Sequence, residues 1–254
     1  MTNYTSRIKA AREIGQNPRI AKSDECWYSK YFVRHFSIYI SCAFAKLGIP
    51  ANIVTVLLGM SGLTGSLCMV FHNIWWNLVG AVLWQFWFIL DCVDGEVARL
   101  LNRTSILGIY LDELSHVVVN STFVLAFGLH VYLLEPTILN LVASIGIYSL
   151  WHWKREIGRI MNSTLVVKGS FEKNTSIIRQ KKPIIRIAIT LCKIFGDVEV
   201  TFFLTAAIIA SHKVGVAFAR RCLYTYTCLL ITYFGIVVFR HIIQISKAEN
   251  AGIS

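Results

Sequence analysis

Apolar stretches of about 20 residues recur along this chain, and that length matches the hydrocarbon thickness of a bilayer. The chain has 254 residues, 55% of them hydrophobic, and its mean hydropathy is +0.57. Because backbone polar groups in lipid must be satisfied within the segment itself, such stretches fold as helices. We therefore predict an all-α integral membrane protein with six transmembrane helices, at roughly 51–72, 76–101, 105–133, 136–160, 197–213 and 218–245.

The residues before the first apolar stretch are of two kinds. Residues 1–23 are polar and basic, which indicates a cytoplasmic lead that is flexible or partly helical. In residues 24–48, aromatic side chains alternate with basic ones, a pattern typical of an amphipathic helix that lies in the membrane interface. A short seventh span at 32–48 is the alternative for this segment. The predicted parts are a lead at 1–23, an amphipathic juxtamembrane helix at 24–48, a six-helix domain at 49–246 and a cytoplasmic tail at 247–254.

The basic residues are distributed asymmetrically between the two sides of the predicted bundle. With the N-terminus in the cytoplasm, 22 of the 25 Lys and Arg lie on the cytoplasmic side, which satisfies the positive-inside rule. The other three are Lys213, Arg220 and Arg221. Because the charges flank apolar helices and do not form one stripe, we expect a lipid bilayer as partner and no nucleic acid. Both termini are then cytoplasmic.

Ionisable residues lie inside two of the predicted spans, where they are costly and therefore point to function. Spacings of three and four residues place side chains on one face of a helix. Two stripes result, one formed by Asp91, Asp94 and Ala98 and the other by Gly108, Asp112 and His116.

A turn at residues 102–104 makes the two helices antiparallel neighbours, so we expect the two stripes to face each other at the cytoplasmic end. Clustered carboxylates in a medium of low dielectric repel one another unless a cation joins them. Sites rich in oxygen ligands suit Mg²⁺ or Mn²⁺. Glu96 and Glu113 point away from the stripes, and we do not expect them to be ligands.

The spacing of these residues resembles the signature of the CDP-alcohol phosphotransferase (CDP-alcohol phosphatidyltransferase) family, D-x2-D-G-x2-A-R-x8-G-x3-D-x3-D. His116 stands where the signature ends in Asp. An upstream P-N-x-x-T element is partly present at 50–55, with one residue inserted between Pro and Asn. The positions that match the signature are Asp91, Asp94, Gly95, Ala98, Arg99, Gly108 and Asp112.

The resemblance implies that a substituted phosphate is moved from a CDP-linked alcohol donor to a hydroxyl acceptor, with release of CMP. The donor would be CDP-diacylglycerol or a CDP-linked polar headgroup, in the biosynthesis of phospholipids or of related glycolipids or polyol phosphates. The resemblance also implies Mg²⁺ or Mn²⁺, with two ions typical of the family, because carboxylates alone would repel a pyrophosphate. Dimers are common in the family, so a homodimer is a candidate assembly.

The residue roles follow from the same resemblance. Asp112 and His116 are the expected catalytic residues. The expected metal ligands are Asp91, Asp94, Asp112 and His116. The residues expected to contact the CDP moiety are Asn52, Thr55, Asp91, Asp94, Gly95, Ala98, Arg99 and Gly108.

His116 leaves three interpretations open. An imidazole can act as a general base near neutral pH or ligate a divalent metal, so the enzyme can be active with His116 in one of those roles. The enzyme can instead use another base, with His116 only positioning the substrate. The third interpretation is a catalytically weak relative that binds nucleotide. Since His removes one negative charge, a softer ion such as Mn²⁺ or Zn²⁺ is then favoured over Mg²⁺.

Two further alternatives concern the basic surface and the protein class. Arg34, Lys154 and Arg155 are candidates to contact the acceptor or a phosphate, or they only set the topology. A cation-coupled membrane transporter is the alternative from another class, because intramembrane acids occur in both. The absence of a sequence repeat argues against the transporter.

Overall fold

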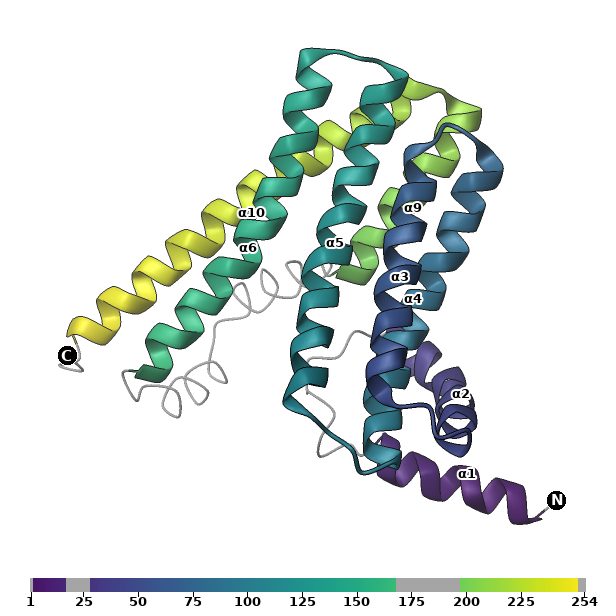
Figure 1. The fold of residues 1–254 in the computed structure, drawn as a ribbon. Helices are drawn as coiled ribbons and strands as arrows, with labels where there is room; N and C mark the ends of the chain where they lie inside the picture. The colour runs from purple at the N-terminus through teal and green to yellow at the C-terminus, as the bar shows by residue number, and fades with distance from the viewer. Residues whose placement is uncertain (1, 17–27, 168–196, 251–254) are drawn as a thin grey trace. The chain divides into compact units, whose positions relative to one another are not determined.

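The computed structural model describes residues 2–16, 28–167 and 197–250, and within those residues every regular element is helical, with no strand (Figure 1). The predicted all-α class is therefore confirmed for the described residues. The chain divides into two units, Met1–Ala126 and Phe127–Ser254. The elements are α1 (Thr2–Gly15), the π-helix η1 (Ser29–Val33), α2 (Arg34–Lys46), α3 (Ala51–Val70), α4 (Ile74–Leu100), α5 (Ile106–Leu134), α6 (Ile138–Val167), α9 (Asp197–Val214) and α10 (Val216–Asn250).

Four helices of the described chain are long and apolar enough to cross a membrane, which indicates an integral membrane protein. The predicted spans at 136–160 and 197–213 fall on α6 and α9, and the apolar part of α9, Thr201–Val214, is shorter than a span. The count of six is therefore not confirmed and stays a prediction. The four candidate spans are Ala51–Val70, Ile74–Leu100, Ile106–Leu134 and Val216–Phe239.

In the first unit, α3 and α4 form a hairpin whose helices approach closely at glycines. A Cβ atom on Gly80 would lie 2.8 Å from the backbone oxygen of Gly65. Small residues allow this kind of approach between helices in a membrane. At the turn, the buried Asn77 amide donates hydrogen bonds to the carbonyls of Cys68 and Phe71, at 3.1 and 2.9 Å. These carbonyls at the end of α3 lack helical partners, so Asn77 fixes the register of the hairpin.

The first part of α5 packs against the same hairpin. Phe123 lies against Trp84 of α4, with ring centroids 4.3 Å apart. Gly62 of α3 lies at the point where three helices meet, because a Cβ there would overlap Val119 of α5 and lie 2.9 Å from Trp87 of α4. The contacts fix how far α4 and α5 are from each other, which matters for the ionisable residues one to two turns along both helices.

The N-terminal helices lie beside the last turns of α4 (Figure 1). Of the predicted lead at 1–23, the structure describes a helix, α1, followed by Gln16. Of the predicted juxtamembrane helix at 24–48, η1 and α2 cover 29–46, and residues 24–27 lie outside the described residues.

The second unit is closed at one end by polar contacts among α5, α6 and α10. Glu135, just after α5, forms an ion pair with Arg220 of α10. Asn140 of α6 donates to the Glu135 carbonyl at 2.7 Å and accepts from the Tyr224 hydroxyl at 2.6 Å. Farther along, Gly128 of α5 lies against Ser144 of α6. The network ties the three helices together by side chains that all have partners.

The close approach of α3 and α4 can be tested with Gly80→Ala. The added Cβ would collide with the Gly65 carbonyl, so we expect the free energy of unfolding in detergent to fall by about 1–3 kcal/mol. The control is Gly146→Ala on α6, where nothing lies within 4 Å of the added atom and no loss is expected. Equal thermal midpoints for Gly80→Ala and the wild type would contradict the helix contact described above.

Candidate metal and phosphate site

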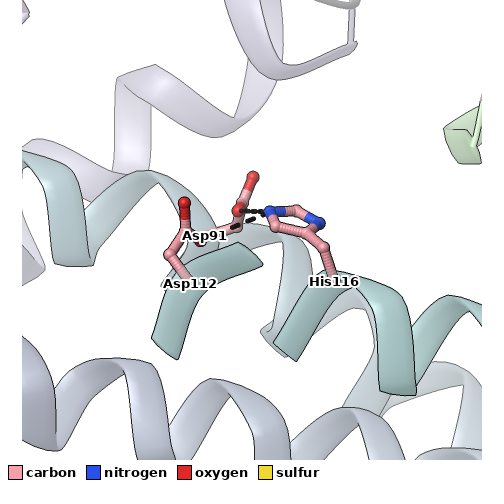
Figure 2. Close-up of side chains that lie close together, drawn as sticks. All are labelled: Asp91, Asp112 and His116. Atoms are coloured by element: carbon pink, nitrogen blue, oxygen red, sulfur yellow. Dashed lines mark ion pairs between the residues drawn. The ribbon is translucent and has the colours of Figure 1, made fainter. Parts of the chain in front are cut away.

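Three ionisable side chains from two helices meet in the first unit. Figure 2 shows Asp91 of α4 beside Asp112 and His116 of α5. His116 Nε2 lies 2.8 Å from Asp91 Oδ1 and 3.4 Å from Asp112 Oδ1. One ligand atom from each residue lies within 4.8 Å of the other two. All three side chains are partly exposed, at 29%, 41% and 24% for Asp91, Asp112 and His116, so the group remains accessible.

The turn between α4 and α5 brings the two helices face to face. Asn102 adopts a positive φ of 51°, and the next amide, of Arg103, donates to the Ala98 carbonyl at 2.9 Å. A residue in the left-handed region followed by this backbone bond is a common way to end an α-helix. Ser105 then accepts from the Gly108 amide at 3.0 Å, which caps the start of α5. Both ends are closed within five residues, so α5 returns directly alongside α4.

Trp87, which is not among the residues predicted from the sequence, forms the inner wall of the site. Its ring meets the His116 imidazole edge to face, with centroids 5.3 Å apart, and its side chain is buried. Gly62 leaves room for the indole, whose Cδ1 lies 2.9 Å from the position of a Cβ there. Trp87 precedes Asp91 by one helical turn, so the four-residue spacing could have placed it on the same stripe as Asp91.

Asp94 is not part of the group formed by Asp91, Asp112 and His116. Its carboxylate is buried at 8% exposure and lies 3.0 Å from the Thr55 hydroxyl of α3. That hydroxyl is also within 3.2 Å of the Ala51 carbonyl. The structure thus brings together Thr55 and Asp94, which the sequence analysis assigned to the same ligand.

Asn52 and Gly108 also lie close together, again from different helices. A Cβ on Gly108 would be 3.0 Å from Asn52 Oδ1 and 3.2 Å from Ser105 Oγ. The missing side chain of Gly108 therefore leaves room for an amide of α3 at the start of α5. These are two of the residues expected to contact the CDP moiety.

The Arg99 side chain contacts α1 and lies beside Gly95 of its own helix. Its Nε donates to the Gly15 carbonyl of α1 at 2.7 Å. Its terminal nitrogens cover Gly95, because a Cβ there would lie 3.1 Å from one of them. The small residue at position 95 thus makes room for the guanidinium. The sequence could not supply the contact with Gly15, which is 84 residues away.

The two acids that were not expected to be ligands lie outside this group. Glu96 is buried against α1 and α2, and Glu113 is exposed. Arg34 begins α2, and its carbonyl accepts from Gln16 at 2.7 Å. Lys154 and Arg155 lie on α6, in the second unit.

Residues 49–169 match the family model for CDP-alcohol phosphatidyltransferase. The chain carries a CDP-alcohol phosphatidyltransferase domain. The predicted resemblance is thus confirmed, and the domain match supports a phosphotransferase that acts on CDP-alcohol donors. A search of curated proteins found no match. All residues of the signature, from Asp91 to His116, lie within the matched part of the phosphatidyltransferase domain.

The chemistry of the three-residue group in the phosphatidyltransferase domain fits a divalent metal, which the family generally uses. Two carboxylates and one imidazole provide hard oxygen ligands and one nitrogen, a set compatible with Mg²⁺, Mn²⁺ or Zn²⁺. Asp112 Oδ1 is buried, and apart from its 3.4 Å ion pair with His116 Nε2 it accepts no hydrogen bond from the described residues. A cation at this position would satisfy that oxygen and offset the repulsion between the two acids.

The contact between Thr55 and Asp94 can be tested in the phosphatidyltransferase domain by Thr55→Val. The substitution keeps the shape of the side chain and removes the donor to a buried carboxylate, so we expect about 1–3 kcal/mol less stability. Thr55→Ser restores the hydroxyl and serves as the control. In an Asp94→Leu background the same Thr55→Val change should cost much less in the thermal midpoint. An equal cost in both backgrounds would show that the two side chains do not interact.

Proposed function

We propose that the protein is a membrane transferase that moves a substituted phosphate from a CDP-linked alcohol donor to a hydroxyl acceptor and releases CMP. The donor is CDP-diacylglycerol or a CDP-linked polar headgroup, and the product belongs to phospholipid, glycolipid or polyol-phosphate biosynthesis. The observation that carries the proposal is the convergence of Asp91, Asp112 and His116 inside the matched family domain. Ligand atoms within 4.8 Å of one another could hold one divalent cation, and such a cation would offset the negative charge of a pyrophosphate.

The metal ligands in this proposal are Asp91, Asp94, Asp112 and His116. Two Mg²⁺ or Mn²⁺ ions, when bound, would neutralise the phosphoryl oxygens and stabilise the departing CMP. Asp91, Asp112 and His116 already lie together, whereas Asp94 would reach a second ion from its position beside Thr55. The same carboxylates, without a cation, would repel the donor.

The donor would lie on the surface shared by α3, α4 and α5. Asn52 and Thr55 would contact it from α3, and Arg99 would bind a phosphate through its guanidinium. The small residues Gly95, Ala98 and Gly108 would leave room for the cytidine and its phosphates. Arg34, Lys154 and Arg155 are the proposed contacts for the acceptor or its phosphate.

The transfer itself needs one proton acceptor. The acceptor hydroxyl attacks the phosphorus, a new P–O bond forms, and the bond to the CMP oxygen breaks with its electron pair. The hydroxyl proton passes to Asp112, or to His116 in the alternative in which His116 is the base and its Nε2 does not bind a metal. His116 Nε2 faces both carboxylates, which would orient the ring and stabilise it once it has taken up the proton.

The proposed architecture places six spans at 49–246 with the site on the cytoplasmic face. The exposed aromatic side chains of η1 and α2 support an interfacial position for 24–48, because such rings favour the boundary between lipid and water. Residues 1–23 and 247–254 are then cytoplasmic. The exposed aromatic residues are Tyr31, Phe32, Phe36 and Tyr39.

The test is CMP release by the purified protein, with a panel of CDP-linked donors and alcohol acceptors and with Mg²⁺ or Mn²⁺. We expect release that requires metal and falls by about 100-fold or more in Asp91→Asn, the size of loss typical when an electrostatic stabiliser is removed. Glu113→Gln, an exposed acid on the next helix, is the matched control and should retain activity.

Two outcomes would contradict the proposal. Cation-dependent flux through vesicles without CMP release would favour the transporter. Nucleotide binding without release for any donor and acceptor would favour a catalytically degenerate relative.

A further inference from the structure

A buried carboxylate in the signature itself joins the N-terminal helices to α4. Glu96, between Asp94 and Arg99 in sequence, is 2% exposed. Its Oε1 accepts from Gln16 Nε2 at 2.9 Å and from Ser37 Oγ at 2.8 Å, and its Oε2 accepts from Ser41 Oγ at 2.7 Å. Removing a carboxylate from water is costly unless it is hydrogen-bonded. The three hydrogen bonds to Glu96 offset that cost.

Gln16 fixes the end of α1 at this point. Its side-chain amide donates to Glu96 and also to the Arg34 carbonyl of α2, at 2.7 Å. The neighbouring Gly15 is buried, and a Cβ added there would be 3.5 Å from Ile38 of α2 and 3.7 Å from Glu96 of α4. The end of α1 therefore lies in the corner between α2 and α4.

The Gly15 carbonyl in that corner holds Arg99. It accepts from Arg99 Nε at 2.7 Å, at the end of a helix where carbonyls carry partial negative charge. Arginine has five N–H donors, so this bond leaves the terminal nitrogens available. They lie over Gly95, next in sequence to Asp94.

We propose that Gln16 and Glu96 are positioning residues for the transfer reaction. They hold the end of α1 against α4, so that the Gly15 carbonyl orients the Arg99 guanidinium toward the phosphates of the CDP-linked donor. The inference rests on the proposed function, in which Arg99 contacts the donor. It makes the N-terminal helix part of the donor site.

The hydrogen-bond pattern tells which substitutions preserve the anchor. In Glu96→Gln the amide oxygen can still accept from Gln16 and Ser37, and the amide nitrogen can donate to Ser41 Oγ. The Ser41 hydrogen then goes to the Ser37 carbonyl, 2.9 Å away. Glu96→Ala removes all three hydrogen bonds to the carboxylate, and Gln16→Ala removes the two bonds by which Gln16 holds the end of α1 to Glu96 and to the Arg34 carbonyl.

The experiment compares steady-state kinetics for Gln16→Ala, Glu96→Ala and Glu96→Gln, with Glu13→Ala as the control on the exposed side of α1. We expect the KM for the CDP-linked donor to rise about tenfold in the two Ala variants of the anchor, the cost of losing an oriented bond to a charged group. The KM for the acceptor should not change. Glu96→Gln and Glu13→Ala should match the wild type.

An anchor that served only stability would give a different result. The donor KM of Gln16→Ala would then equal that of the wild type, whether or not the thermal midpoint fell. That result overturns the proposal. If Glu96→Ala does not fold, Gln16→Ala decides the question, because Gln16 is only half-buried at the end of its helix.

Calorimetric titration with CDP in the presence of Mn²⁺ separates this proposal from the proposed function. If the wild type binds CDP but releases no CMP, the proposed transfer reaction is wrong. The positioning role is then decided by the dissociation constants of the variants for CDP. A rise of about tenfold in Gln16→Ala and in Glu96→Ala, with no rise in Glu96→Gln, supports the role. An unchanged dissociation constant, or no CDP binding by the wild type, overturns it.

Discussion

The contact between Asp91 and His116 joins α4 and α5, which also meet through the rings of Trp84 and Phe123. Ionisable groups at this depth are tolerated only with partners, so each side chain depends on the other helix being in place. That placement depends on Gly62, where α3, α4 and α5 meet, and on the short turn after α4. Trp87 closes the inner side of the group and limits the directions from which a ligand can approach.

Helical periodicity predicted much of the site from the sequence. Spacings of three and four residues placed Asp91 on one stripe and Asp112 and His116 on another. In the structure, Asp91 of the first stripe lies 2.8 Å from His116 of the second. The same rule put Asp94 beside Asp91. Side chains three apart are offset by about 60° around a helix, and here that offset turns Asp94 toward Thr55 of α3. Periodicity describes one helix and cannot say which neighbour a side chain meets.

The contacts around Glu96 and Arg99 lay beyond any local pattern. Gln16 is 80 residues from Glu96, and no spacing rule connects a polar N-terminal segment to a helix that far along the chain. Glu96 points away from the acidic stripe, as the sequence analysis expected, but its burial gives it partners of its own. Composition described the N-terminal segment as a polar lead, whereas the structure makes its first helix a neighbour of the signature.

The central claim is that Asp91, Asp112 and His116 together hold a divalent metal. Pulsed electron paramagnetic resonance on the purified protein loaded with Mn²⁺ tests it most directly, because a bound imidazole nitrogen couples to the electron spin. The account predicts bound Mn²⁺ with a nitrogen coupling that disappears in His116→Gln, and much weaker binding in Asp91→Asn. Mn²⁺ that binds equally well to the wild type and Asp91→Asn, or that does not bind at all, would contradict it.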